Sequence, residues 1–108
     1  MDKQAKKILL DIARKSIVAA ITGEIKPPFF CDHPDLLGKQ GVFVTLKTHE
    51  HLRGCIGRFV SDMPLYQMVS ELAISSATED PRFEFNRIKP QELNQLKIEI
   101  SVLSPLMP

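Results

Sequence analysis

Hydrophobic side chains recur with two different periods along this chain, and these periods constrain its fold more than any other feature. Residues 2–22 carry apolar side chains at every third or fourth position, the period of a helix with one buried face. Residues 97–103 alternate strictly, which predicts a half-buried strand with Ile98, Ile100 and Val102 on one side. A chain with both periods is expected to pack helix stripes against a sheet.

The segment after the first helix is a long connection over residues 24–40. Gly23 is a plausible helix stop, and the Pro-Pro pair that follows prevents continuation. Seventeen residues are many for a structureless loop, so part of this segment is expected to be ordered. We expect Phe29 and Phe30 to pin it to the core.

The middle of the chain predicts a hairpin followed by a second helix. Residues 42–47 and 52–59 are predicted strands, with a hairpin loop over residues 48–51. Asp62 is the expected N-cap of the second helix. The helix then carries the apolar-stripe residues Leu65, Met68, Val69, Leu72, Ala73 and Ser76 and ends before the Asp80-Pro81 pair.

A short helical turn near Pro90, carrying Leu93 and Leu96, is expected to precede the last strand. The predicted order is therefore helix, two strands, helix, short helix and strand. This order favours an α+β fold in which an antiparallel sheet is flanked by helices.

Composition limits the class of protein. The 108 residues suffice for one domain, and no apolar run approaches the roughly 20 residues that span a bilayer. Charged residues interrupt the N-terminal apolar stretches, so we expect no signal peptide and a cytoplasmic protein. Cys31 and Cys55 form no CxxC pair and are expected to stay reduced. A net charge of +1 argues against nucleic acid or a membrane as partner.

Four stretches of this sequence, in order and spacing, resemble one family. They are Leu-Arg-Gly-Cys-Ile-Gly at residues 52–57, Gly-Val-Phe-Val-Thr-Leu at 41–46, Asp-Pro-Arg-Phe at 80–83 and Ile-Glu-Ile-Ser-Val-Leu-Ser-Pro at 98–105. The chain is therefore identified by resemblance as a member of the AMMECR family. The resemblance implies an α+β fold with an antiparallel sheet.

Family members usually continue beyond the position of residues 104–105. Residues 1–108 are therefore expected to form a single AMMECR-like domain that lacks the C-terminal part of the family domain. In microbes the resemblance also implies an accessory role beside a Memo-type protein and a radical-SAM protein.

Arg53 and Cys55 are two residues apart, so a regular strand would place them on one face. There a guanidinium would favour the thiolate and make Cys55 a candidate catalytic nucleophile. Gly54 and Gly57 mark a bulge, a close approach of a ligand or a place where a covering helix fits. In the alternative interpretation Cys55 is a small core residue, and Arg53 is tied to a buried carboxylate.

The register of the hairpin decides which face Cys55 occupies. A five-residue loop places it on the face of Phe43, Thr45 and Lys47, whereas a four-residue loop pairs it with Val44 among buried aliphatic side chains. The sequence leaves both registers open.

No cofactor or metal is expected. The possible ligands Cys31, His33, His49, His51 and Cys55 lack the common structural-zinc spacings. The sequence also contains no GxSxG, P-loop or GxGxxG motif. Asp80, Arg82 and Glu84 follow the second helix, where local pinning of a loop is favoured over catalysis.

Three functions are consistent with these residues. The favoured one is a binding or accessory module, whose groove near residues 52–57 uses Arg53, Gly54, Cys55, Gly57, Asp80 and Arg82 to hold a protein or small anionic ligand. A thiol-dependent enzyme or carrier using Cys55 is the second, although no general base is evident. The third is a structural subunit of a larger complex. The last strand would also expose a free edge, which favours homo-oligomers through that strand.

Overall fold

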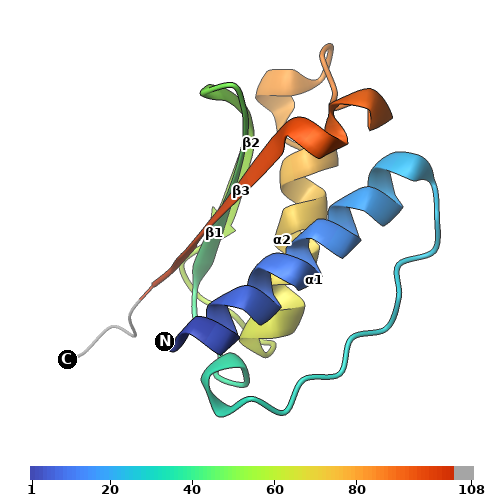
Figure 1. Cartoon of the computed structure of the whole chain (residues 1–108). Helices are drawn as coiled ribbons and strands as arrows, with labels where there is room; N and C mark the ends of the chain where they lie inside the picture. The colour runs from blue at the N-terminus through green and yellow to red at the C-terminus, as the bar shows by residue number, and fades with distance from the viewer. Residues whose placement is uncertain (104–108) are drawn as a thin grey trace.

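Two helices cover one face of a three-stranded antiparallel sheet in the computed structural model, which describes residues 1–103 (Figure 1). Ser104 and Pro105 of the family-like stretch lie outside the described residues. Helix α1 spans Lys3–Thr22 and α2 spans Leu65–Thr78. The strands, in the spatial order β2-β1-β3, are β1 Val42–Thr48, β2 His51–Arg58 and β3 Leu96–Val102. Short 3-10 helices are η1 Pro34–Leu36, η2 Pro81–Phe83 and η3 Pro90–Gln95. The predicted α+β class is confirmed.

Helix α1 ends at the predicted stop and begins at Lys3, one residue after the predicted start. The Asp2 carboxylate accepts a hydrogen bond from the Ala5 backbone N–H at 2.7 Å, and Gly23 ends the helix in the left-handed conformation with φ 77°. The buried residues of the helix are Ala5, Leu9, Ile12, Ala13, Ser16, Ile17 and Ala19. None of the helices in residues 1–103 is long and apolar enough to cross a membrane.

The connection between α1 and β1 is anchored differently from the prediction. Phe30 is 97% exposed and Phe29 is only half-buried, so the aromatic pair does not pin the segment. Neighbouring side chains on an extended backbone point to opposite sides, and both rings therefore could not enter the core together. The fully buried Leu36 in η1 and the partly buried Cys31 make the core contacts instead.

Helix α2 lacks the predicted cap at Asp62. Pro64 occupies the N-cap position and makes no side-chain cap bond. The first free N–H of the helix, that of Leu65, donates instead to the Gly38 carbonyl at 2.9 Å. A backbone group of the preceding connection thus replaces the expected side-chain cap, and the buried stripe of the helix matches the prediction.

The core lies between the helices and the even-numbered side of β1. Val42, Val44 and Leu46 are fully buried there. At the contact between the helices, the Ser16 and Ser70 hydroxyls lie 2.6 Å apart, and Ser16 also donates to a carbonyl of its own helix. The two buried polar groups in this interface are therefore satisfied by each other and by the backbone.

Strands β1 and β2 meet in a two-residue turn, not in the predicted four-residue loop. His49 and Glu50 form the turn, with φ values of 49° and 69°. Positive φ at both turn residues is the geometry that matches the natural twist of a hairpin. Strand β1 consequently extends to Thr48, and β2 starts at His51.

Candidate functional site

A β-bulge in β2 decides which way the residues of the 52–57 segment face. Leu46 lies opposite Gly54, but the next residue of β1, Lys47, lies opposite Leu52. Arg53 is therefore an extra residue on β2. A bulge of this kind interrupts the alternation of side chains along a strand, and neither of the two simple loop lengths considered from the sequence describes this hairpin.

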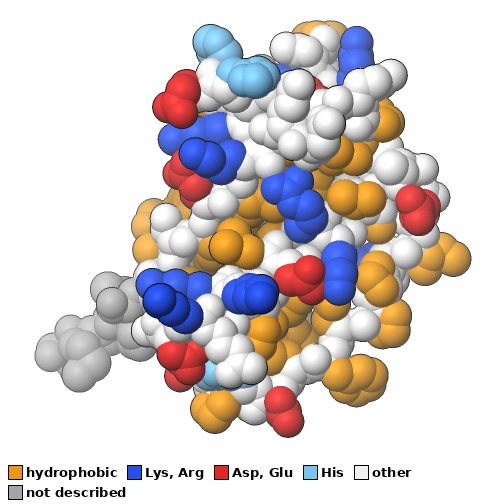
Figure 2. All heavy atoms as spheres, in the orientation of Figure 1, with side chains coloured by type: hydrophobic (Ala, Val, Ile, Leu, Met, Phe, Trp, Pro, Cys, Tyr) orange, Lys and Arg blue, Asp and Glu red, His pale blue; other side chains and the backbone are white. Residues whose placement is uncertain are grey.

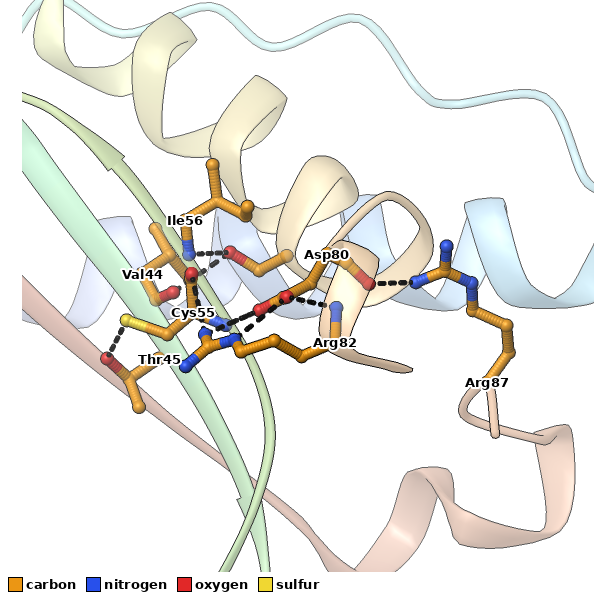
Figure 3. A network of polar contacts seen from close by, with 8 residues as sticks. Val44, Thr45, Cys55, Ile56, Asp80, Arg82 and Arg87 are labelled. Atoms are coloured by element: carbon orange, nitrogen blue, oxygen red, sulfur yellow. Dashed lines mark hydrogen bonds and ion pairs between the residues drawn. The ribbon is translucent and has the colours of Figure 1, made fainter. Parts of the chain in front are cut away.

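Cys55 lies on the side of the sheet away from the helices. It pairs with Thr45, and its Sγ is 3.2 Å from the Thr45 Oγ1 (Figure 3). The thiol thus shares a face with Phe43 and Thr45, and the arrangement that paired Cys55 with Val44 is wrong. Within residues 1–103, Thr45 is the only hydrogen-bond partner of Sγ.

Arg53 reaches the opposite, helix-covered side and is tied to a carboxylate. Its Nε donates to Glu92 Oε2 at 2.6 Å, and its Nη2 donates to Glu92 Oε1 at 3.2 Å. Thr48, from the buried side of β1, donates to the same carboxylate at 2.8 Å. The expectation that Arg53 and Cys55 share a face is therefore wrong, because the bulge shifts the alternation by one residue.

The Arg53–Glu92 pair is largely removed from solvent, with the side chains 11% and 19% exposed. The hydrogen bond from Arg53 holds the pKa of the Glu92 carboxyl below its ordinary value, against the opposing effect of burial. Arg53 also donates to the Asn86 carbonyl at 3.0 Å. The structural alternative for Arg53, a tie to a buried carboxylate, matches this geometry. A binding role for Arg53 stays a prediction.

Asp80 holds the outer edge of β2. Its carboxylate is 1% exposed and accepts the Cys55 backbone N–H at 2.9 Å and the Arg82 guanidinium at 2.7 Å. The Arg82 side chain also donates to the Cys55 carbonyl at 3.3 Å. Hydrogen bonds from Arg82 hold the pKa of the Asp80 carboxyl far below its ordinary value despite burial. Figure 3 shows this network, in which Arg87 donates to the Asp80 backbone carbonyl.

Ser76 on α2 links β1 to β2, a role that no sequence motif indicated. Its hydroxyl donates to the Val44 carbonyl at 2.9 Å and accepts from the Ile56 N–H at 3.0 Å. The helix comes so close here that a Cβ on Gly54 would lie 1.9 Å from the Ser76 carbonyl oxygen. Gly54 therefore admits the covering helix, which was the structural alternative for this residue. A polar residue within an apolar stripe was the only available sequence signal.

Gly57 meets a side chain instead of a helix. A Cβ at this position would lie 2.3 Å from the Phe43 ring of the neighbouring strand. That ring packs edge-on against Phe59, with centroids 5.4 Å apart. The two glycines of the motif thus accommodate different neighbours on opposite sides of the sheet.

The histidines and cysteines considered as metal ligands do not converge in the described residues. His49 lies at the hairpin turn, with Nε2 3.2 Å from Gln95 Oε1. His33 groups with Asp2 and Asp35, but its ring already bonds to Asp2, the N-cap of α1. Cys31 and Cys55 are both free thiols. Helix capping accounts for the acidic group around His33.

Most polar groups of this site bond to one another, and the Cys55 thiol and the Arg82 guanidinium remain accessible. Asp80 and Ser76 hold the backbone on either side of Cys55, leaving a half-buried thiol on the open face. Beside it the Arg82 side chain is 57% exposed. This surface can offer a guanidinium and a thiol to a ligand. Glu84 lies exposed nearby in the chain.

This fold and site define a class of α+β protein in which a Leu-Arg-Gly-Cys-Ile-Gly strand packs closely against a covering helix. The sequence profile of the AMMECR1 family matches residues 10–108, so the chain belongs to the AMMECR1 family. The family predicted from the sequence is confirmed.

Relatives and one solved structure agree with this assignment. A protein of Methanothermobacter thermautotrophicus is 42% identical over 103 residues, covering 94% of this chain and 53% of that protein. Protein MK0488 of Methanopyrus kandleri is 45% identical over 105 residues, covering 92% of this chain and 48% of that protein. The crystal structure of the uncharacterized protein PH0010 from Pyrococcus horikoshii matches with a TM-score of 0.75 and 41% identity, covering 90% of this chain and 50% of that one. The chain spans about half the length of these relatives.

Proposed function

We propose that this chain is a binding or accessory module that holds a protein or a small anionic ligand beside residues 52–57. The observation that carries the proposal is the Arg82 guanidinium, which Asp80 fixes next to Cys55 while more than half of the side chain stays exposed. A guanidinium held in a fixed orientation binds carboxylate or phosphate with little further loss of freedom. Both guanidinium groups are bonded to a carboxylate, but Arg53 is the poorer candidate because its side chain is only 11% exposed.

The distribution of charge supports a compact ligand over nucleic acid. In Figure 2 the Lys and Arg side chains on the visible face are interspersed with Asp and Glu and with apolar side chains. Nucleic-acid binding instead draws on clustered basic residues. From the family resemblance, Memo-type and radical-SAM proteins are the first partners to test, with the cytoplasm as the expected location.

Thiol catalysis by Cys55 is less well supported. A thiol nucleophile needs an adjacent base or a comparable activating group. The hydroxyl of Thr45 is the partner of Sγ, whereas His49 is bonded to Gln95 at the hairpin turn. A cysteine reactivity profile across pH tests the alternative, since an activated thiol would react well below the ordinary thiol pKa of about 8.5.

The binding proposal is tested with Arg82→Ala and a matched control, Arg58→Ala. Arg58 is an exposed arginine at the end of β2, the strand that carries Cys55. Inorganic phosphate is titrated into each protein while backbone amide NMR shifts are followed, which also reports whether each variant is folded. We expect saturable amide shifts near Cys55. The phosphate affinity measured from them should fall at least several-fold in Arg82→Ala and stay unchanged in Arg58→Ala. An equal loss of phosphate affinity in both variants, or no saturable shifts at all, would contradict the proposal that this surface binds anions.

A further inference from the structure

Two arginine side chains share one aromatic ring in η2. The guanidinium carbons of Arg53 and Arg82 each lie over the Phe83 ring, 5.7 Å from its centroid. A cation within about 6 Å of a ring centroid is attracted to the electron-rich face of the ring. The ring itself is half-buried. Phe83 is therefore in contact both with the exposed guanidinium of Arg82 and with the enclosed one of Arg53.

The surroundings of Phe83 fix the position of its ring. The Phe83 N–H donates to the Asp80 carbonyl at 3.1 Å, and the Phe83 carbonyl accepts the Asn86 N–H at 3.0 Å. Arg53 donates to the Asn86 carbonyl at 3.0 Å and is itself held by the Glu92 carboxylate. The ring is thus restrained by its own turn and by a side chain of β2, so it can serve as a firm support for another group.

The hydrogen bonds of Arg82 leave one of its nitrogens available to a ligand (Figure 3). Nε donates to Asp80 Oδ1 at 3.1 Å, and Nη2 donates to Asp80 Oδ2 at 2.7 Å and to the Cys55 carbonyl at 3.3 Å. Nη1 has no hydrogen-bond partner within residues 1–103. All donors of a guanidinium lie in its plane. Contact with the Phe83 ring therefore adds a restraint on tilting that these bonds do not supply.

We propose that Phe83 is a positioning residue for anion binding, whose ring orients the Arg82 guanidinium so that Nη1 faces the ligand. This inference rests on the proposed function of the Arg82 surface and specifies which donor the ligand uses. Because Asp80 and the Cys55 carbonyl engage Nε and Nη2, the anion meets a single nitrogen, not the two-nitrogen fork that an unpaired guanidinium offers. A donor that is already oriented loses less freedom on binding, which raises the affinity.

Phosphate titration of three variants tests the role of the ring in binding. Phe83→Leu removes the aromatic face and keeps an apolar side chain, whereas Phe83→Tyr keeps the ring. Phe85→Leu is the matched control, since Phe85 lies in the same segment and is 97% exposed. Backbone amide NMR spectra show whether each variant is folded. The affinity for inorganic phosphate should fall roughly two- to five-fold in Phe83→Leu. It should stay unchanged in Phe83→Tyr and Phe85→Leu.

A second measurement needs no ligand. The ¹⁵N relaxation of the Arg82 Nε–H group reports the mobility of this side chain, and that of the Arg82 backbone N–H reports the mobility of η2. We expect the order parameter of Nε–H to fall in Phe83→Leu and to recover in Phe83→Tyr. The backbone order parameter should stay constant, because Asp80 still accepts the Arg82 N–H.

The combined results separate this inference from the proposed function. Unchanged Nε–H order in Phe83→Leu would overturn the inference. An equal loss of order at the backbone would also overturn it, since Phe83 would then only stabilise η2. A more mobile Arg82 side chain with unaltered phosphate affinity would show that the orientation does not serve binding. Absence of phosphate binding by the parent chain would contradict the proposed function, and the relaxation data alone would then decide whether Phe83 orients Arg82.

Discussion

The Arg53 guanidinium and the Glu92 carboxylate form a two-point ion pair between β2 and η3, with N–O distances of 2.6 and 3.2 Å. The residues are 39 positions apart, and Thr48 adds a third hydrogen bond to the same carboxylate. Arg53 of the 52–57 segment thus attaches η3, and with it the start of β3, to the hairpin.

Loss of either member of this pair should destabilise the fold. We expect Arg53→Ala or Glu92→Gln to lower the free energy of unfolding by about 3 kcal/mol, because the remaining group is left largely buried without its partner. Arg53→Lys should lose part of this amount, since an ammonium lacks the two-point geometry. Urea unfolding at pH 7 measures each value. The control is Glu99→Gln, which breaks the exposed Lys47–Glu99 pair and should change stability by less than about 1 kcal/mol. If the Arg53 variants lose almost no free energy of unfolding, the ion pair is unimportant for stability and Arg53 would again be a candidate for ligand binding.

Asp80 should make the stability depend on pH in acid. Its folded-state pKa is depressed, so its contribution is fully present above the unfolded-state value near 3.8 and is lost as pH falls from there toward the folded-state pKa. Asp80→Asn should therefore be less stable than the parent chain at pH 7, by about 1.5–3 kcal/mol for hydrogen bonds to a charged group. The difference should shrink below about pH 4. Urea unfolding between pH 7 and pH 2.5 tests this, with the exposed Asp11→Asn as control. Parallel stability curves over the whole pH range would show that the Asp80 charge contributes nothing.

Gly54 should be intolerant of any side chain. Its alanine variant would place a methyl group against the Ser76 carbonyl, a backbone atom that moves only with α2. We expect Gly54→Ala to cost about 1–3 kcal/mol, the usual range for overpacking a tight core. Gly38→Ala is a suitable control because a Cβ there meets only the Gln40 side chain, at 3.5 Å. Thermal unfolding of the two variants gives the comparison, and a Gly54→Ala protein as stable as the control would mean that the helix has room to withdraw.

Local patterns were sufficient for the elements and their order. The 3.6-residue and two-residue periods identified α1, α2 and β3, and Gly23 marked the end of α1 correctly. These features depend on residues a few positions apart, whose spacing is visible in the sequence. The recognised motif also identified the family.

Several features were decided only by the tertiary structure. The Leu65 N–H is capped by the Gly38 carbonyl, and the Ser76 hydroxyl bridges the backbones of β1 and β2 by hydrogen bonds. The bulge at Arg53 reversed the expected relation between Arg53 and Cys55, since one extra residue moves a side chain to the other face. The hydrophobic period and the sequence motif identify which residues can pack or bind. Which of them meet depends on contacts between segments far apart in the chain, and those form only when the helices lie on the sheet.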